Sequence, residues 1–166
     1  MGKIYQIRKK NLSFLTSSFI IPQRGGFMKK LKYFIPAIIL MIIIFSFSQQ
    51  TGQESSGLSS QIVVWIQTHL HITISEFFIR KAAHMSEYAL LTSTFIYGFY
   101  HCDYSLKQIL LFSLCATFLY ACSDEVHQLF IGGRAGQWRD VLIDTSGGLI
   151  ASIIYYFIHP YIKKTH

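Results

Sequence analysis

Apolar residues in this chain occur in long blocks, the pattern of membrane-spanning helices. The first block covers residues 31–47 and follows Lys29 and Lys30. Its length is near the lower limit for crossing a bilayer. A signal peptide shares the basic start and apolar middle, but this apolar stretch is longer than a usual signal core and no Ala-x-Ala cleavage site follows it. We therefore expect a retained first span.

The stretch after the first block changes character twice. Residues 49–61 are polar and contain several Gly, Ser and Gln, which predicts a flexible linker. Ile62, Ile66 and Leu70 then recur at helical spacing, with Trp65 beside them. Because tryptophan favours the membrane–water interface, we expect a short interfacial helix there.

Residues 73–100, 105–130 and 138–158 are predicted to form three further spanning helices. The first two begin with Thr or Ser followed three residues later by Glu or Gln, which is the spacing of a capping box. Gly132 follows the second, and Pro160 is expected to end the third. The expected fold class is therefore all-α, a polytopic four-transmembrane-helix bundle with the short interfacial helix after the first span.

Composition and charge agree with a membrane location. The chain is 51% hydrophobic and only 14% charged, whereas soluble domains have about 25% charged residues. The net charge of +7 resembles that of a nucleic-acid-binding protein, but eleven of the fifteen Lys and Arg lie on one side of the predicted spans. That side should be the cytoplasm. We expect both termini inside, the lipid bilayer as partner and no binding of nucleic acid; the oligomeric state stays open.

The predicted spans divide the chain into three parts. Residues 1–27 form a basic tail with an apolar patch too short to cross a membrane, residues 28–162 form the transmembrane domain, and residues 163–166 are a short basic tail. Met28 and two lysines directly before an apolar span are a typical beginning for a small membrane protein. We therefore expect translation to start at Met28.

Polar residues concentrate at the outer ends of the last three predicted helices, although a charge at a helix centre costs about 2.5–3.5 kcal/mol in a membrane. Six of the eight acidic residues lie there: Glu76, Glu87, Asp124, Glu125, Asp140 and Asp144. Polar or small residues recur on each helix at steps of three and four, which places them on one face. These stripes are Arg80, His84, Glu87 and Tyr88; Ser113, Thr117, Tyr120, Asp124 and His127; and Asp140, Asp144, Gly147 and Ala151. We expect the three stripes to face one another.

Cysteine contributes little to the predicted chemistry. Cys102, Cys115 and Cys122 show no zinc-binding spacing and are expected to be unpaired, mostly buried thiols. No cofactor is expected.

Several segments together resemble one family. They are Arg80-Lys81-Ala82-Ala83-His84-Met85-Ser86-Glu87-Tyr88, Ser123-Asp124-Glu125-Val126-His127-Gln128-Leu129-Phe130, the later Arg134, Asp140, Asp144 and Gly147-Gly148, and the end of the first span, Phe45-Ser46-Phe47-Ser48-Gln49. The chain resembles the VanZ-like family of small bacterial membrane proteins over roughly residues 28–160. Asp144 departs from the resemblance, which leads us to expect Asn there more often. The resemblance implies a location in the bacterial cytoplasmic membrane and an effect on low-level resistance to teicoplanin, and it implies no established reaction.

Three accounts of the polar cluster stay open. It could lock the helices in register without a ligand. The favoured account is a site for an anionic or peptide envelope ligand, because Arg134 and Arg139 flank a Gly-rich turn before a helix N-terminus. The expected ligand-binding residues are His84, Glu87, Tyr88, Asp124, Glu125, His127, Gln128, Arg134, Arg139, Asp140 and Asp144.

The third account is an enzyme acting on a lipid-linked or peptide envelope substrate. His84 would be the general base, oriented by Glu87 or Asp124, with Glu125 a further candidate and Arg134 holding an anion. A metal-dependent hydrolase is a weaker variant. His84-x-x-Glu87 and Asp124-x-x-His127 have the spacing of the inward ligand pairs in di-metal bundles.

Overall fold

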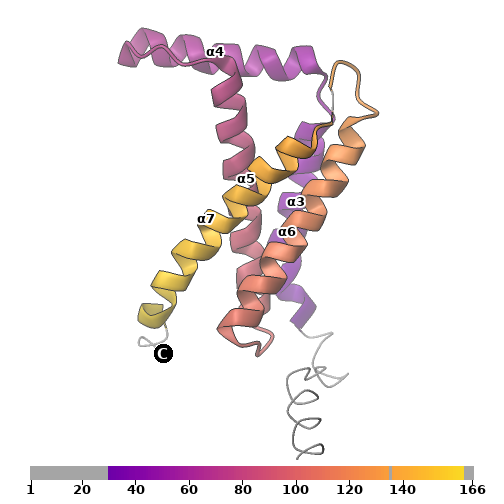
Figure 1. Cartoon of the computed structure of the whole chain (residues 1–166), viewed down its shortest axis with the longest axis vertical. Coiled ribbons are helices and arrows are strands. Elements are labelled where there is room, and N and C mark those ends of the chain that lie inside the picture. Colours follow the sequence, from indigo (N-terminus) through magenta and orange to yellow (C-terminus); the bar gives the residue numbers. More distant parts are fainter. Residues whose placement is uncertain (1–29, 135, 163–166) are drawn as a thin grey trace, which may run out of the picture.

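The computed structural model describes residues 30–134 and 136–162, so the predicted tails 1–27 and 163–166 and the predicted start at Met28 lie outside the described residues. The described residues contain helices and no strand, which confirms the all-α class. The elements are the 3-10 helix η1 (Leu31–Phe34) and the α-helices α3 (Ile35–Ser48), α4 (Gly52–Leu70), α5 (Glu76–Tyr100), α6 (Leu106–Gln128) and α7 (Trp138–Ile162) (Figure 1).

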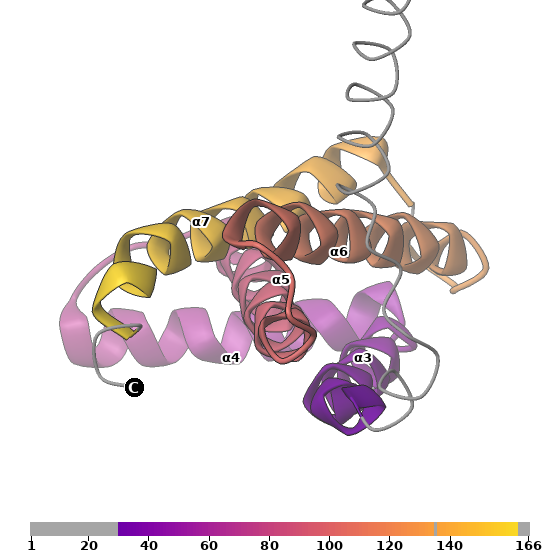
Figure 2. The ribbon, with the colours of Figure 1, turned by 90° about the horizontal axis from the view of Figure 1, so that it is seen from below.

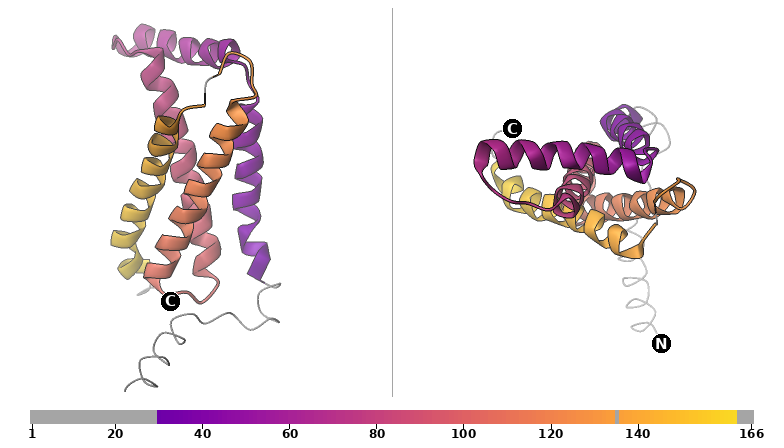
Figure 3. Two further views of the ribbon diagram at one scale, coloured as in Figure 1. Left: turned by 45° about the vertical axis from the view of Figure 1, so that its right-hand side comes forward. Right: turned by 90° about the horizontal axis from the view of Figure 1, so that it is seen from above.

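Four helices form the bundle and the fifth crosses one end of it. Helices α3, α5, α6 and α7 run between the two ends of the bundle, while α4 lies across one end (Figure 1). The start of α3, the turn between α5 and α6, and the end of α7 all lie at the other end (Figure 3). Helix α5 is central, since it contacts α3, α4, α6 and α7. Figure 2 shows α3 and α7 on different sides of α5.

Three helical segments are long and apolar enough to cross a membrane: Leu31–Ser48, α6 and α7. Helix α5 is 25 residues long, but its first turns carry Arg80, Lys81, His84 and Glu87, which lower its apolar character. Two of its buried polar residues have partners on α6: Tyr88 bonds to Asp124 and Thr92 bonds to Thr117. The fourth span therefore stays a prediction.

The prediction of a flexible linker over residues 49–61 is wrong, because α4 already begins at Gly52. Thr51 and Glu54 form a capping box: Thr51 Oγ1 accepts from the Glu54 N–H at 3.3 Å, and Glu54 Oε2 accepts from the Thr51 N–H at 2.8 Å. The same Thr51 N–H lowers the pKa of the Glu54 carboxyl below its ordinary value. Helix α4 is consequently 19 residues long. It ends at Leu70, and its capping residue His71 has φ 54°.

Two other predicted helix boundaries also need correction. Helix α5 is capped by Ser75, which accepts from the Phe78 N–H at 3.3 Å, and not by Thr73. Helix α7 continues past Pro160 to Ile162. A proline so close to a helix end removes only one backbone hydrogen bond of the final turn, so the helix tolerates it.

Other sequence predictions hold to different degrees. The capping box of Ser105 and Gln108 is present at the start of α6. All three cysteines are free, but only Cys102 is buried, whereas Cys115 is exposed. The expectation of mostly buried thiols is therefore wrong, because Cys115 lies on the outward face of α6.

Glycines allow α5 and α7 to pack closely. Gly147 and Gly148 are both buried, and a Cβ added at Gly147 would overlap the carbonyl oxygen of Met85. A Cβ at Gly148 would lie 2.5 Å from Thr92 Oγ1, which itself hydrogen-bonds to Thr117 Oγ1 at 2.8 Å. Helices α5 and α7 therefore meet at backbone distance at Gly147, as small residues permit in membrane bundles. Beside Gly148, the Thr92 and Thr117 side chains join α5 to α6.

Candidate functional site

A cavity of about 190 Å³ lies at the α4 end of the bundle. The start of α4, the first turns of α5, the end of α6, the connecting segment and the start of α7 all contribute to it. The lining residues are Gly52, Phe77, Arg80, Lys81, His84, Gln128, Gly133, Arg134, Gln137 and Asp140. We call this cavity the polar pocket.

Close backbone contacts bring these five elements together. The Gly52 N–H donates to the Gly132 carbonyl oxygen at 3.3 Å, and a Cβ at Gly52 would overlap the carbonyl oxygen of Gly133. Gly133 has φ 75°, a conformation that glycine adopts without strain. Arg134 Nε donates to the Gln50 carbonyl oxygen at 3.0 Å. The turn between α3 and α4 is thus joined to the segment between α6 and α7.

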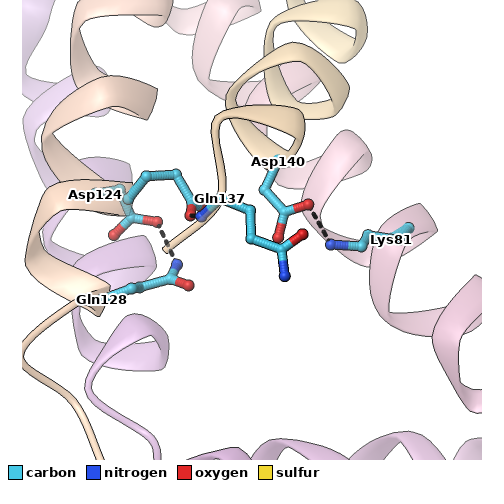
Figure 4. A network of polar contacts seen from close by, with 6 residues as sticks. Lys81, Asp124, Gln128, Gln137 and Asp140 are labelled. Carbon is cyan, nitrogen blue, oxygen red and sulfur yellow. Dashed lines mark hydrogen bonds and ion pairs between the residues drawn. The ribbon is translucent and has the colours of Figure 1, made fainter. Parts of the chain in front are cut away.

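Three cationic side chains line the polar pocket. Lys81 on α5 pairs with Asp140 on α7 (Figure 4). Arg80 and Arg134 have no carboxylate within ion-pair distance among the described residues. Partial burial lowers the pKa of Arg134 from its ordinary value, while the negative charge of Asp124 opposes this shift and the positive charge of Arg80 adds to it. An arginine nevertheless stays charged in a protein, so the pocket holds two guanidinium charges without a direct ion pair, and the nearest acids act on Arg134 only through space.

Two buried acids connect α6 with its neighbours behind the pocket. Asp124 accepts from the Tyr88 hydroxyl at 3.2 Å and from Gln128 Nε2 at 3.1 Å. Glu125 accepts from the Gln137 N–H at 2.8 Å, which positions the segment before α7. Figure 4 shows Asp124 and Gln128 on one side and Asp140 and Lys81 on the other, with the Gln137 side chain between them.

Several polar atoms near the pocket lack a hydrogen-bond partner. Both carboxylate oxygens of Asp144, which is 1% exposed, and Oδ1 of Asp124 are unpaired. His84 Nδ1 is also unpaired and lies 3.9 Å from Glu87 Oε2, beyond hydrogen-bond distance. The predicted stripes of α5 and α6 meet at Tyr88 and Asp124, whereas Tyr120 of the α6 stripe donates to the Met41 carbonyl oxygen of α3. Acidic groups lie behind the cationic side chains of the pocket.

Two of the predicted ligand-binding residues lie away from the pocket. His127 faces α3, with Nε2 3.1 Å from Gln49 Nε2 and its ring centroid 4.6 Å from that of Phe45. Arg139 is exposed, with its guanidinium 5.7 Å from the centroid of the Trp138 ring. Five further residues of the predicted set do not line the pocket: Glu87, Tyr88, Asp124, Glu125 and Asp144.

The pocket also contains residues absent from the predicted set. The lining residues outside that set are Arg80, Lys81, Phe77, Gln137, Gly52 and Gly133, of which only Arg80 lay on a predicted polar stripe. The spacing of Lys81 three residues before His84 could have indicated Lys81, because both then lie on one helical face. Gly52 could not be found from sequence, since only the folded chain brings α4 to the connecting segment.

The predicted metal pairs do not come together. Within residues 30–134 and 136–162, no three His, Cys, Asp or Glu side chains are arranged to hold a metal ion. His127 turns toward Gln49, while Asp124 is bonded to Tyr88 and Gln128.

A protein-family model described as VanZ/LLP1 matches residues 33–159. The chain belongs to the VanZ/LLP1 family. No curated protein and no solved structure matches it. The matched residues include α3, α4, α5 and α6, α7 up to residue 159, and the whole polar pocket. The resemblance seen in the sequence is therefore confirmed for the part of the chain that holds the candidate site.

Proposed function

We propose that this VanZ/LLP1 protein binds an anionic ligand of the bacterial envelope in the polar pocket, and that binding changes sensitivity to teicoplanin-type antibiotics. The observation that carries the proposal is the pair Arg80 and Arg134, which reach one cavity from two elements without a carboxylate partner. A purely structural network would pair its buried or half-buried charges, because an unpaired charge in a membrane protein is costly.

We further propose a four-span arrangement in the cytoplasmic membrane, with the α4 end outside and both termini inside. The distribution of Lys and Arg supports it. Eleven of the fifteen lie on the predicted inner side: eight at or before the start of the first span, Lys107 at the start of α6, and two after α7. Helix α4 would lie along the outer surface. Leu58, Ile62 and Trp65 are exposed on it at helical spacing, as expected of an interfacial helix.

Cysteine labelling tests this arrangement. In a background without the three native cysteines, Gln61→Cys on α4 should react with an impermeant thiol reagent added to intact cells. Lys107→Cys, at the opposite end, should react only after the cells are opened. Labelling of Lys107→Cys alone in intact cells would invert the proposed orientation.

A second candidate function is an acid–base enzyme. The observation in its favour is that His84 lines the pocket and lies near Glu87. The binding function is favoured because it needs only the cationic groups that already converge, whereas the enzyme also needs a reacting group that the residues of the pocket do not identify.

Substitution of the two arginines tests the binding function. Arg80→Gln and Arg134→Gln should each lower affinity for an anion about tenfold, because a charged hydrogen bond contributes about 1.5–3 kcal/mol. Membrane abundance should stay normal, and tolerance of teicoplanin should fall in cells that depend on this protein. Binding is measured with inorganic phosphate by calorimetry on the purified protein.

Arg139→Gln is the matched control, because Arg139 is exposed and outside the pocket. It should leave both affinity and tolerance unchanged. If both pocket variants disappear from the membrane, the cluster is structural. If both keep full affinity and tolerance, the proposed site is wrong.

A further inference from the structure

We infer that the anion held in the polar pocket is the phosphate of a bilayer-resident amphiphile, whose hydrocarbon tail leaves the pocket beside Phe77 and stays in the membrane. The inference rests on the proposed anion-binding function and names its ligand class. Four observations support it: the depth of the pocket, its open side, its floor and its size.

The depth follows from exposed aromatic residues around the α4 end. Phe77 and Phe78 at the start of α5 are each 61% exposed, Phe130 after α6 is 82% exposed and Trp138 at the start of α7 is 70% exposed. Trp65 on α4 is exposed as well. Tryptophan at the ends of spans marks the level of lipid headgroups. Since Trp138 directly follows Gln137, which lines the pocket, Arg80 and Arg134 lie at the level of lipid phosphates.

The open side of the pocket is placed at Phe77, a lining residue with a largely exposed ring. The start of α4 crosses this end of the bundle and is bonded to the Gly-rich segment through Gly52 and Gly132 (Figure 1). Phe77, in contrast, combines a place in the pocket wall with a largely exposed ring. The ring also lies 5.3 Å from Lys81 Nζ. Phe77 therefore offers an apolar surface that continues directly from the cationic groups, as an amphiphile requires.

The floor of the pocket stops an anion from moving deeper. Asp140 lines the pocket, while Asp124, Glu125 and Asp144 lie buried behind it, with unpaired oxygens on Asp124 and Asp144. These acids oppose a second negative charge in the bundle. The favourable position for an anion is consequently between Arg80, Lys81 and Arg134, at the lipid-facing edge.

Size and donor geometry point to phosphate. A cavity of 190 Å³ is smaller than the roughly 300–1,000 Å³ of pockets that enclose a whole small-molecule ligand. It has room for a charged headgroup while the remainder of the ligand stays outside. Guanidinium groups bind phosphate through paired N–H donors, and a lysine adds a compact charge.

The test uses the full-length protein in dodecyl maltoside micelles, which contain no phosphate, and measures affinity for four probes: phosphatidic acid, polyprenyl phosphate, inorganic phosphate and alanyl-alanine. At least one lipid phosphate should bind about tenfold or more tightly than inorganic phosphate, because its tail contacts Phe77. Preference for phosphatidic acid identifies an ordinary lipid headgroup, and preference for polyprenyl phosphate identifies a lipid-linked precursor. Both results support the inference.

Phe77→Ser supplies the decisive comparison. It should weaken lipid-phosphate binding about tenfold and leave inorganic-phosphate binding unchanged, while Phe78→Ser, equally exposed but outside the pocket, should change neither. Equal affinity for inorganic and lipid phosphate, or a preference for alanyl-alanine, overturns the inference and leaves the proposed anion site standing. Absence of binding by all four probes overturns both.

Discussion

Gly147→Leu is expected to prevent close packing of α5 on α7 and to remove most folded protein from the membrane. Even the first side-chain carbon would overlap the Met85 carbonyl oxygen, which belongs to the backbone of α5 and cannot move alone. Overpacking a tight interface costs about 1–3 kcal/mol for small additions and more for larger ones. The measurement is the thermal unfolding midpoint and the yield of monodisperse protein in mild detergent.

Gly57→Leu is the control for this experiment. Gly57 lies within α4, and a Cβ there would meet nothing within 4 Å. Because leucine favours a helix over glycine by roughly 0.8 kcal/mol or slightly less, this variant should be as stable as the parent or slightly more so. Equal midpoints for Gly147→Leu and the parent protein would contradict the packing of α5 on α7.

Capping residues show what the sequence could predict of the fold. The Ser105–Gln108 box correctly located the start of α6, because a clear apolar block follows it. The identical arrangement at Thr51 and Glu54 gave no such signal, since residues 52–61 are polar and lack an apolar stripe. The first half of α4 is instead stabilised by tertiary contacts, such as the close approach of Gly52 to Gly133. Local periodicity cannot encode such contacts.

The candidate site was predictable where helical spacing alone decides which side chains meet. His84 and Asp140 lie on predicted stripes and line the pocket, and Asp124 of the α6 stripe bonds to Tyr88 of the α5 stripe. His127 has the same spacing, yet its ring packs against α3. The position of α3 around the bundle is set by packing across helices far apart in sequence, so the spacing on α6 cannot distinguish a residue facing α3 from one facing the pocket.

The residues around Lys81 illustrate a second limit. A lysine at the start of a span is usually explained by membrane orientation. A specific role of such a lysine in a site is therefore hard to recognise from the sequence. The partner of Lys81, Asp140, lies 59 residues later on α7. Only the crossing of α5 and α7 brings the two residues together. The pair can then act either as a structural ion pair or as part of a binding site.

Asp140→Asn should separate those two roles, because it is expected to lower stability and raise anion affinity. The Lys81–Asp140 pair is about four-fifths buried on both sides, so losing its charge-assisted hydrogen bond should cost about 1–3 kcal/mol. Among the described residues, Asp140 is the only acid that lines the pocket, and the substitution removes its charge and leaves Lys81 free to contact the ligand. With an effective dielectric constant of about 20, removing one like charge roughly 7–10 Å away favours a bound anion by about 1.7–2.4 kcal/mol, or roughly 20- to 50-fold in affinity.

Lys81→Met breaks the same ion pair by removing its cation instead of its anion. It should lower stability by a similar amount, but it removes a cation from the pocket and leaves Asp140 unpaired, so affinity for inorganic phosphate should fall about tenfold or more. Unfolding midpoints and calorimetric affinities of both variants are measured in parallel. If affinity follows stability in both, the pair acts only by bracing α5 against α7. Opposite changes in affinity at similar losses of stability mean that Lys81 and Asp140 set the charge of a working anion site.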